Sequence, residues 1–335
     1  MKPSPGTNDR VFHRHASRGR FRRPCRCSRL IAALAVLLLL ASPATAIRLT
    51  YVDHLFDVTY RFNAPSDVAV STTDRIYVVD GVNNQVKMFG YNGAFISSFG
   101  REGSDSGEFN QPLGIDVDDS GRVYVADAGN HRVQIFGADG EFIAQIQLTG
   151  TAKHAADPTD VVVDETGNRC YVVDNDNHRL LVYRLSDFKR MGVYGKPGND
   201  KLEFKYPFLA TLDKAKRLYV VDVANTRVQV IKPDGAYAGT IGDWGVEKGE
   251  FFRPKGVAVD QNGRVFVTDS YMGVIQIFSE TGEFYAAIGE PATGKVKKFD
   301  TPVGIFLDRQ DRLYVVEMFA NKVGVYRQAG EADSK

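Results

Sequence analysis

The chain has 335 residues, of which 43% are hydrophobic, so it can bury a continuous core. Its charge is uneven, because residues 1–46 contain nine of the 42 basic residues and one of the 41 acidic residues. The remaining residues carry 33 basic and 40 acidic side chains, a net charge of about −7. A body of that sign repels polyanions, which argues against nucleic acid as a partner.

The first 46 residues have the layout of a secretory signal. Basic residues up to Arg29 precede an unbroken apolar run of 12 residues, Leu30 to Ala41, and small residues end at Ala46. We predict cleavage after Ala46 and export to the periplasm or the extracellular space. The alternative is an uncleaved anchor formed by residues 30–46, which would be the protein's contact with a membrane, although a span needs about 20 apolar residues.

The segment after the signal is predicted to pair with the end of the chain. Nine residues follow Tyr326, too few to complete the last unit with an outer strand of its own. We therefore expect Ile47–Val52 to form the missing strand and to lie against Lys322–Tyr326, which removes an open sheet edge. Residues 329–335 are predicted to form a C-terminal tail.

One sequence unit recurs six times between residues 47 and 328. Each copy opens on a proline, and successive prolines are 46 to 49 positions apart: Pro65, Pro112, Pro158, Pro207, Pro254 and Pro302. An acidic residue ends the second apolar run of each copy: Asp80, Asp127, Asp174, Asp222, Asp269 and Glu317. This period is typical of an array of blades, in which each small sheet packs on its neighbours.

The second copy illustrates the strands that we expect in a unit. Apolar or alternating runs at 115–118, 123–126, 133–136 and 142–146 are separated by turn residues such as Asp, Gly and Asn. Four short antiparallel strands in each unit are typical of a propeller blade. We therefore predict an all-β fold for residues 47–328, a six-bladed β-propeller of four-stranded antiparallel blades, closed by the N-terminal strand.

Two segments, Asp127–Phe136 and Asp174–Leu180, closely resemble the NHL repeat, and with the spacing above they make the chain similar to exported bacterial NHL-repeat propellers. The resemblance covers roughly residues 47–328. Relatives in this family include amidating lyases, RNA-binding propellers and many exported bacterial proteins without known chemistry. The resemblance therefore implies the fold and leaves the function open.

Residues that recur in every unit are expected to be scaffold. We predict that the acidic column caps the turn after the second strand, and that Arg132, Arg179 and Arg227 tie turns together. His131 and His178 occupy equivalent turns, and other units lack a histidine at that position. We interpret both as structural residues rather than metal ligands.

Residues that depart from the repeat near the opening proline are candidates for a site in the central channel. In the amidating lyases, zinc-binding histidines directly follow this proline, but the chain has no histidine there: the residues are Ser66, Leu113, Thr159, Phe208, Lys255 and Val303. Lactonase-type propellers hold calcium with carboxylates in the channel, where this chain offers Asp67 and Asp160. Two acids fall short of the six or more oxygens that calcium takes, so we expect no cofactor and no metal, with calcium as the alternative. The candidate channel mouth comprises Ser66, Asp67, Thr159, Asp160 and Lys255.

Apolar residues replace polar ones in the turns of the last two units and after the N-terminal strand: Leu55, Phe56, Tyr271, Met272, Met318 and Phe319. On one face of a propeller they would form a contiguous patch for a partner, and the alternative is local packing of these side chains. We predict a non-catalytic exported propeller that binds or scaffolds a protein or a small ligand outside the cytoplasm. The alternative function is a metal-dependent lactonase or lyase, with calcium or zinc in the channel.

Overall fold

The computed structural model describes residues 46–333, so the predicted signal and its anchor alternative lie outside the described residues except for Ala46. The regular secondary structure of the described part consists of β-strands and two short 3₁₀ helices, Ala128–Asn130 and Val223–Asn225. No helix within it has the length and apolar character that crossing a membrane requires.

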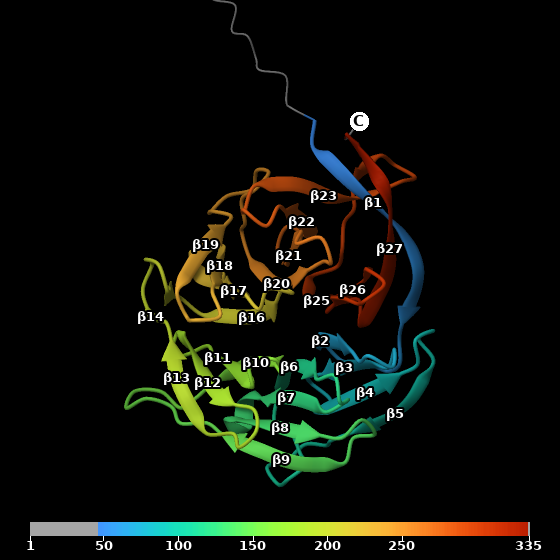
Figure 1. The fold of residues 1–335 in the computed structure, drawn as a ribbon. Coiled ribbons are helices and arrows are strands. Elements are labelled where there is room, and N and C mark those ends of the chain that lie inside the picture. The colour runs from blue at the N-terminus through green and yellow to red at the C-terminus, as the bar shows by residue number, and fades with distance from the viewer. Residues whose placement is uncertain (1–45, 334–335) are drawn as a thin grey trace, which may run out of the picture. The chain divides into compact units, whose positions relative to one another are not determined.

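Four sheets are separate antiparallel blades of four strands each, in chain order (Figure 1). The first holds β2 (Pro65–Val70), β3 (Ile76–Asp80), β4 (Gln85–Phe89) and β5 (Phe95–Phe99). The second holds β6 (Pro112–Val117), β7 (Val123–Asp127), β8 (Arg132–Phe136) and β9 (Phe142–Gln147). The third holds β10 (Pro158–Asp164), β11 (Arg169–Asp174), β12 (Arg179–Arg184) and β13 (Arg190–Tyr194). The fourth holds β16 (Pro207–Leu212), β17 (Leu218–Asp222), β18 (Arg227–Ile231) and β19 (Tyr237–Ile241). A short parallel pair, β14 (Lys196–Pro197) and β15 (Glu203–Phe204), precedes the fourth blade.

The remaining strands form one continuous nine-stranded sheet in the order β20-β21-β22-β23-β1-β27-β26-β25, with β24 paired to β23. The strands are β1 (Arg48–Val58), β20 (Pro254–Val259), β21 (Val265–Asp269), β22 (Val274–Phe278), β23 (Phe284–Glu290), β24 (Lys295–Val296), β25 (Pro302–Leu307), β26 (Arg312–Glu317) and β27 (Lys322–Asp333). Its two end strands, β20 and β25, contact each other, so the sheet is nearly closed. The prediction of six blades is therefore wrong: the structure has four blades and this larger sheet.

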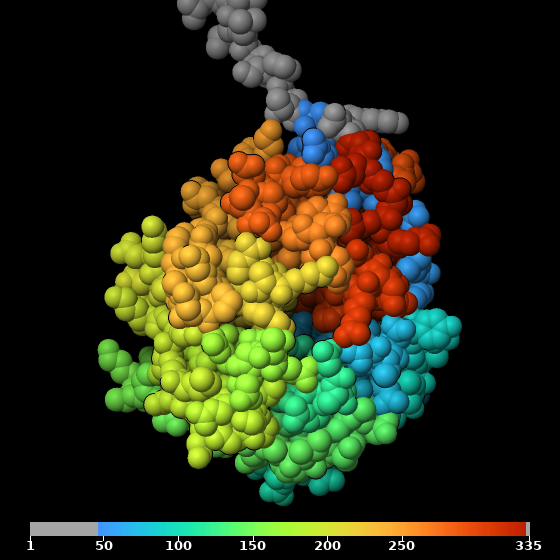
Figure 2. Space-filling model, in the orientation of Figure 1, coloured from blue at the N-terminus to red at the C-terminus, as the bar shows by residue number. Residues whose placement is uncertain are grey.

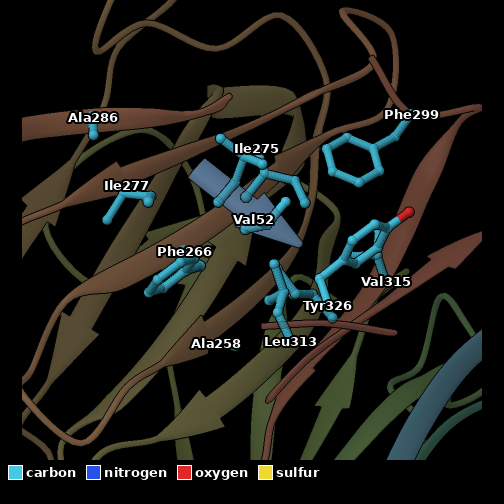
Figure 3. Close-up of a cluster of buried hydrophobic side chains, with 12 residues drawn as sticks. Val52, Ala258, Phe266, Ile275, Ile277, Ala286, Phe299, Leu313, Val315 and Tyr326 are labelled. Atoms are coloured by element: carbon cyan, nitrogen blue, oxygen red, sulfur yellow. The ribbon is translucent and has the colours of Figure 1, made fainter. Parts of the chain in front are cut away.

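The cause of this difference is the pairing of β1. The strand lies antiparallel to β27 and also pairs in parallel with β23, where Leu49, Thr50 and Tyr51 lie opposite Ala287, Ile288 and Gly289. The parallel pairing merges strands that we expected in separate sheets. Figure 3 shows the result inside the sheet, where Val52 of β1 lies among Phe266, Ile275, Leu313 and Tyr326 in one buried cluster.

The register of β1 against β27 also differs from the prediction. Tyr326 lies opposite His54 and Val323 opposite Val58, so the residues opposite Lys322–Tyr326 come from the second half of β1. Residues 54–58, expected as a loop, belong to the strand, and residues 329–333, expected as a tail, continue β27. Both strands are longer than the sequence pattern indicated, and β-bulges at Tyr51/Val52 and His54/Phe56 adjust their pairing.

The first strands of the repeated units line the middle of the molecule. We call β2, β6, β10, β16, β20 and β25 the inner strands. Each contacts the next in this order, and β25 contacts β2, so together they form a ring around the centre of the molecule (Figure 1). We call the space inside this ring the central channel. Between neighbouring sheets, fully buried aromatic rings fill the core, among them Tyr77, Tyr124, Tyr171 and Tyr219. This packing fixes the inner strands and the side chains that they turn toward the channel.

Candidate functional site

The acidic column holds each sheet to the loop that precedes its inner strand. Asp127, fully buried, accepts a hydrogen bond of 2.7 Å from the backbone N–H of Asn110 and others from the side chains of Asn130 and Arg132. It makes no cap bond to the backbone of the turn that follows it, so our prediction of a turn cap is wrong for this residue. Asp269 differs from Asp127, because it accepts hydrogen bonds from backbone N–H groups of the following turn, those of Tyr271 and Met272.

The repeated Arg and His residues form hydrogen bonds to nearby loops and strands. Arg132 pairs with Asp127 at 2.8 Å and donates to the carbonyl oxygens of Asp105 and Glu108 in the loop nearby. His131 donates from Nδ1 to the carbonyl of Ala156 at 2.6 Å, and His178 accepts from the N–H of Tyr206 at 3.1 Å. These bonds join neighbouring sheets and leave neither imidazole directed at the channel.

The channel contains a cavity of about 390 Å³. It is lined from the middle of the inner strands to the turns at their carboxyl ends, with Asp67, Asp116 and Asp160 in its wall. Figure 2 shows the molecule hollowed at the centre of the face turned to the viewer. Three carboxyl groups from three consecutive inner strands therefore line the wall of one cavity.

Each of these three carboxyl groups is held by the backbone of the next inner strand. Ile115 N–H donates to Asp67 Oδ2 at 3.1 Å, Val163 N–H to Asp116 Oδ2 at 2.8 Å, and Ala210 N–H to Asp160 Oδ2 at 2.7 Å. Glycines make room for two of the side chains. A Cβ on Gly114 would lie 2.4 Å from Asp160 Oδ1, and one on Gly304 would lie 2.6 Å from Asp67 Oδ1. The carboxyl groups are therefore positioned by sequence features of the neighbouring strands.

Burial changes the protonation of this cluster. Removal from water, with a smaller effect of Asp116, raises the pKa of Asp67 to about 8. Burial raises the pKa of Asp116 to about 6. Burial and the nearby charge of Asp67 raise the pKa of Asp160 well above its ordinary value. At neutral pH the cavity therefore holds both protonated carboxyl groups and at least one carboxylate.

The other predicted channel-mouth residues lie elsewhere. The Ser66 hydroxyl donates to the carbonyl of Leu113 at 2.6 Å, and the Thr159 hydroxyl to that of Phe208 at 2.8 Å, so both join inner strands. Lys255 is at the opposite end of the channel from the cavity, with its Nζ 3.9 Å from the centre of the Phe208 ring. The structure thus brings Asp67 and Asp160 together in the cavity and keeps Ser66, Thr159 and Lys255 out of its wall.

Asp116 is a cavity residue that the sequence reasoning missed. It stands four positions after Pro112, where the other inner strands carry Ala69, Val162, Thr211, Ala258 and Phe306. A charged residue among these is a departure from the repeat, which is the signal that identified Asp67 and Asp160. The predicted channel residues all come from the two positions directly after each proline, which do not include Asp116.

An ion pair crosses the outer opening of the cavity. Arg309 Nη2, after β25, donates to Asp119 Oδ1, after β6, at 2.8 Å. Both side chains are exposed and both line the cavity. In the ring of inner strands, β2 of the first blade lies between β25 and β6. Lys214 reaches the carbonyl of Gln261 at 3.2 Å on the same rim.

The residues of the predicted apolar patch differ in burial. Tyr271 and Phe319 are about two-thirds exposed, and Tyr271 packs beside Phe252, with ring centres 4.3 Å apart. Phe56 and Met318 instead pack against a buried core cluster, and Met272 is partly buried. Leu55 is 37% exposed but lies, with Phe56, on β1 at the edge of the molecule rather than in a face loop.

Within residues 46–333, no group of three His, Cys, Asp or Glu side chains could hold a metal ion. The cavity carboxyls are committed to backbone N–H groups, and burial favours their protonated forms. Calcium takes six to eight oxygen ligands, and Asp67, Asp116 and Asp160 each have one oxygen that already accepts a backbone hydrogen bond.

Comparison with known proteins supports the fold. A model of the NHL repeat matches residues 109–136, 156–183 and 251–278. No curated protein matches the chain. A solved streptogramin B lyase structure has a TM-score of 0.61 at 12% identity, covering 82% of this chain and 97% of that one. Virginiamycin B lyase from Staphylococcus aureus has a TM-score of 0.55 at 15% identity, covering 78% and 80%.

A gluconolactonase from Xanthomonas campestris is also similar, with a TM-score of 0.60 at 15% identity, covering 82% of this chain and 89% of that one. At such low identities the likeness concerns the fold alone. The chain contains NHL repeats in a β-propeller-like arrangement of four-stranded antiparallel blades.

Proposed function

We propose that this protein is a non-catalytic binding propeller that takes a small hydroxyl-bearing ligand in the channel cavity. The observation that carries the proposal is the convergence of Asp67, Asp116 and Asp160 on one cavity, each fixed by an N–H group of the next inner strand. The cavity volume of about 390 Å³ falls within the range of about 300–1,000 Å³ found for small-molecule sites.

The protonation of the cluster supports an uncharged polar ligand. Asp67, with a pKa of about 8, is protonated at neutral pH and can donate a hydrogen bond. Asp116, with a pKa of about 6, is ionised and accepts one. A ligand whose neighbouring groups both donate and accept, as in a sugar or a polyol, matches this pairing.

We propose further that the N-terminal 46 residues direct export, so that the ligand is met outside the cytoplasm. The basic flank, the apolar run of 12 residues and the small residues before Ala46 support this. Mass determination of the protein recovered from its native cell envelope tests it: a chain beginning at Ile47 is expected, and a full-length chain would contradict cleavage.

Calorimetric titration with a panel of monosaccharides and polyols tests the binding proposal. An ionised acceptor contributes about 1.5–3 kcal/mol, so Asp116→Asn is expected to weaken binding by at least tenfold while keeping an oxygen for the Val163 N–H. The exposed Asp139→Asn is the matched control and should bind like the wild type. Equal affinity in Asp116→Asn, or no binding by any member of the panel, would contradict the proposal.

An enzymatic function is the second candidate, because a carboxyl group with a pKa of about 8 in a cavity could act as a general acid or base. The similarity in fold to streptogramin B lyase and gluconolactonase supports testing it. Lactone hydrolysis should be followed with wild type, Asp67→Asn and Asp139→Asn. Turnover that is lost only in Asp67→Asn would replace binding by catalysis.

A further inference from the structure

Lys255 is a partly buried cation at the channel end opposite the acidic cavity. It directly follows Pro254 at the start of β20, and its Nζ lies 3.9 Å from the ring centre of Phe208, which directly follows Pro207 at the start of β16. The corresponding residues of the other inner strands carry no charge: Ser66, Leu113, Thr159 and Val303. Lys255 is therefore the single charged side chain at this position.

Within residues 46–333, the Lys255 Nζ has no ion pair and no hydrogen bond to protein, and Phe208 is its recorded contact. Two other cations of the described residues, one buried and one partly buried, have acidic partners, whereas Lys297, also partly buried, contacts the rings of Phe299 and Tyr326. Arg132 pairs with Asp127 at 2.8 Å, and Lys322 pairs with Glu317 at 3.3 Å. Removing a cation from water without an opposite charge is unfavourable, so the partial burial of the Lys255 ammonium beside the Phe208 ring has an energetic cost.

The charges around Lys255 do not compensate it. Arg253, two residues earlier, is a second cation and makes no ion pair within residues 46–333. Burial, with a smaller effect of Arg253, lowers the pKa of Lys255 to about 8. On the strands packed against β20, β21 ends in Asp269, whose carboxylate bonds the N–H groups of Phe252 and Arg253. β17 ends in Asp222, which bonds the side chains of Asn225 and Arg227. Both nearby acids are thus committed to the scaffold.

We propose that Lys255, Arg253 and Phe208 form a binding site for a small organic carboxylate. Its negative group would contact the two unpaired cations, and its apolar part would contact the Phe208 ring. An ammonium beside an aromatic ring fits such a two-part ligand better than a fully hydrated inorganic anion. The site is at the other end of the channel from Asp67, Asp116 and Asp160, so it stands or fails independently of the proposed function.

Calorimetric titration of the full chain with benzoate tests the site, with inorganic phosphate as the second arm. Benzoate is expected to bind wild type and Lys255→Arg, and to lose at least tenfold in affinity for Lys255→Met. Lys232→Met, at an exposed lysine in the β18–β19 turn, is the matched control and should bind like the wild type. Benzoate that fails to bind, binding that survives in Lys255→Met, or phosphate that binds as tightly as benzoate would overturn the proposal.

A pH series separates this site from a merely structural role of Lys255. A group with a pKa of about 8 is mostly charged at pH 7 and about 3% charged at pH 9.5, so benzoate affinity should fall by up to about thirtyfold between these values. Lys255→Arg stays charged and should show little change over the same range. Equal pH dependence in the two proteins would overturn the assignment of Lys255 as the contact.

Discussion

Replacing Asp67 by Asn is expected to stabilise the protein increasingly as pH rises. Asp67 is 7% exposed, and burial makes its carboxylate form unfavourable in the folded state. An Asn side chain has nearly the same shape and keeps an oxygen for the Ile115 N–H. The substitution therefore removes the ionisation while it preserves the link between β2 and β6.

The magnitude follows from proton linkage. The pKa of Asp67 rises from 3.8 to about 8 on folding, so the folded state holds a proton that the unfolded chain loses near pH 4. This contribution to the free energy of unfolding is complete below pH 4 and is lost as pH rises toward 8, by about 1.4 kcal/mol per pH unit. Between pH 5 and pH 7 the wild type should therefore lose about 3 kcal/mol relative to Asp67→Asn.

Urea unfolding followed by far-ultraviolet circular dichroism at pH 5, 6 and 7 measures the difference. Asp139→Asn serves as the control, because Asp139 is 82% exposed and its substitution should leave a difference from wild type that does not change with pH. Asp160, coupled to Asp67, also titrates in this range, so the difference between the proteins, rather than either curve alone, is the quantity to compare. A difference between Asp67→Asn and wild type that stays constant from pH 5 to pH 7 would refute the reasoning.

Three further predictions concern the scaffold and the surface. Deleting residues 47–53 removes the part of β1 that pairs with both β23 and β27. The loss of buried Leu49 and Val52 should lower the free energy of unfolding by more than about 4 kcal/mol. An unchanged melting temperature would contradict this expectation. Arg132→Ala leaves buried Asp127 without its cation and should cost about 3–5 kcal/mol in urea unfolding, whereas the exposed Arg101→Ala should cost less than about 1. Phe319→Ser should leave the melting temperature within about 2 °C of wild type, because Phe319 is exposed. Met318→Ser should lower the melting temperature, because Met318 packs against the core. Similar shifts in the two variants would mean that the two side chains are equally buried.

The strands within each unit were predictable because their signals are local. In the second unit the expected runs at 115–118, 123–126, 133–136 and 142–146 fall on β6 to β9, where turn residues and apolar alternation determine the limits. The number of blades was not predictable in the same way. It depends on the parallel contact of Leu49 with Ala287, two residues far apart in the chain whose pairing leaves no local pattern.

The candidate site could be predicted in part. Asp67 and Asp160 depart from the repeat two positions after the opening proline, and this departure identifies them. Asp116 departs from the repeat four positions after Pro112, beyond the positions on which the prediction was based. The contact between Lys255 and Phe208 was not predictable, because it joins two different inner strands, β20 and β16, and the sequence of neither strand indicates it alone. Composition and spacing also could not distinguish exposed Phe319 from its neighbour Met318, because an apolar residue in a turn can face either solvent or the core.

The position of β1 between β23 and β27 has a consequence for the synthesis of the protein. About 260 residues separate the end of β1 from the start of β27, so the strand is made long before its antiparallel partner exists. At roughly 5–20 residues per second, the interval is on the order of tens of seconds. During that time Leu49, Thr50 and Val52, all buried in the finished protein, belong to a strand without a neighbour, and such a strand can pair with another chain. A cell that makes this protein must therefore keep the newly made N-terminal strand from pairing elsewhere until the last strand is complete.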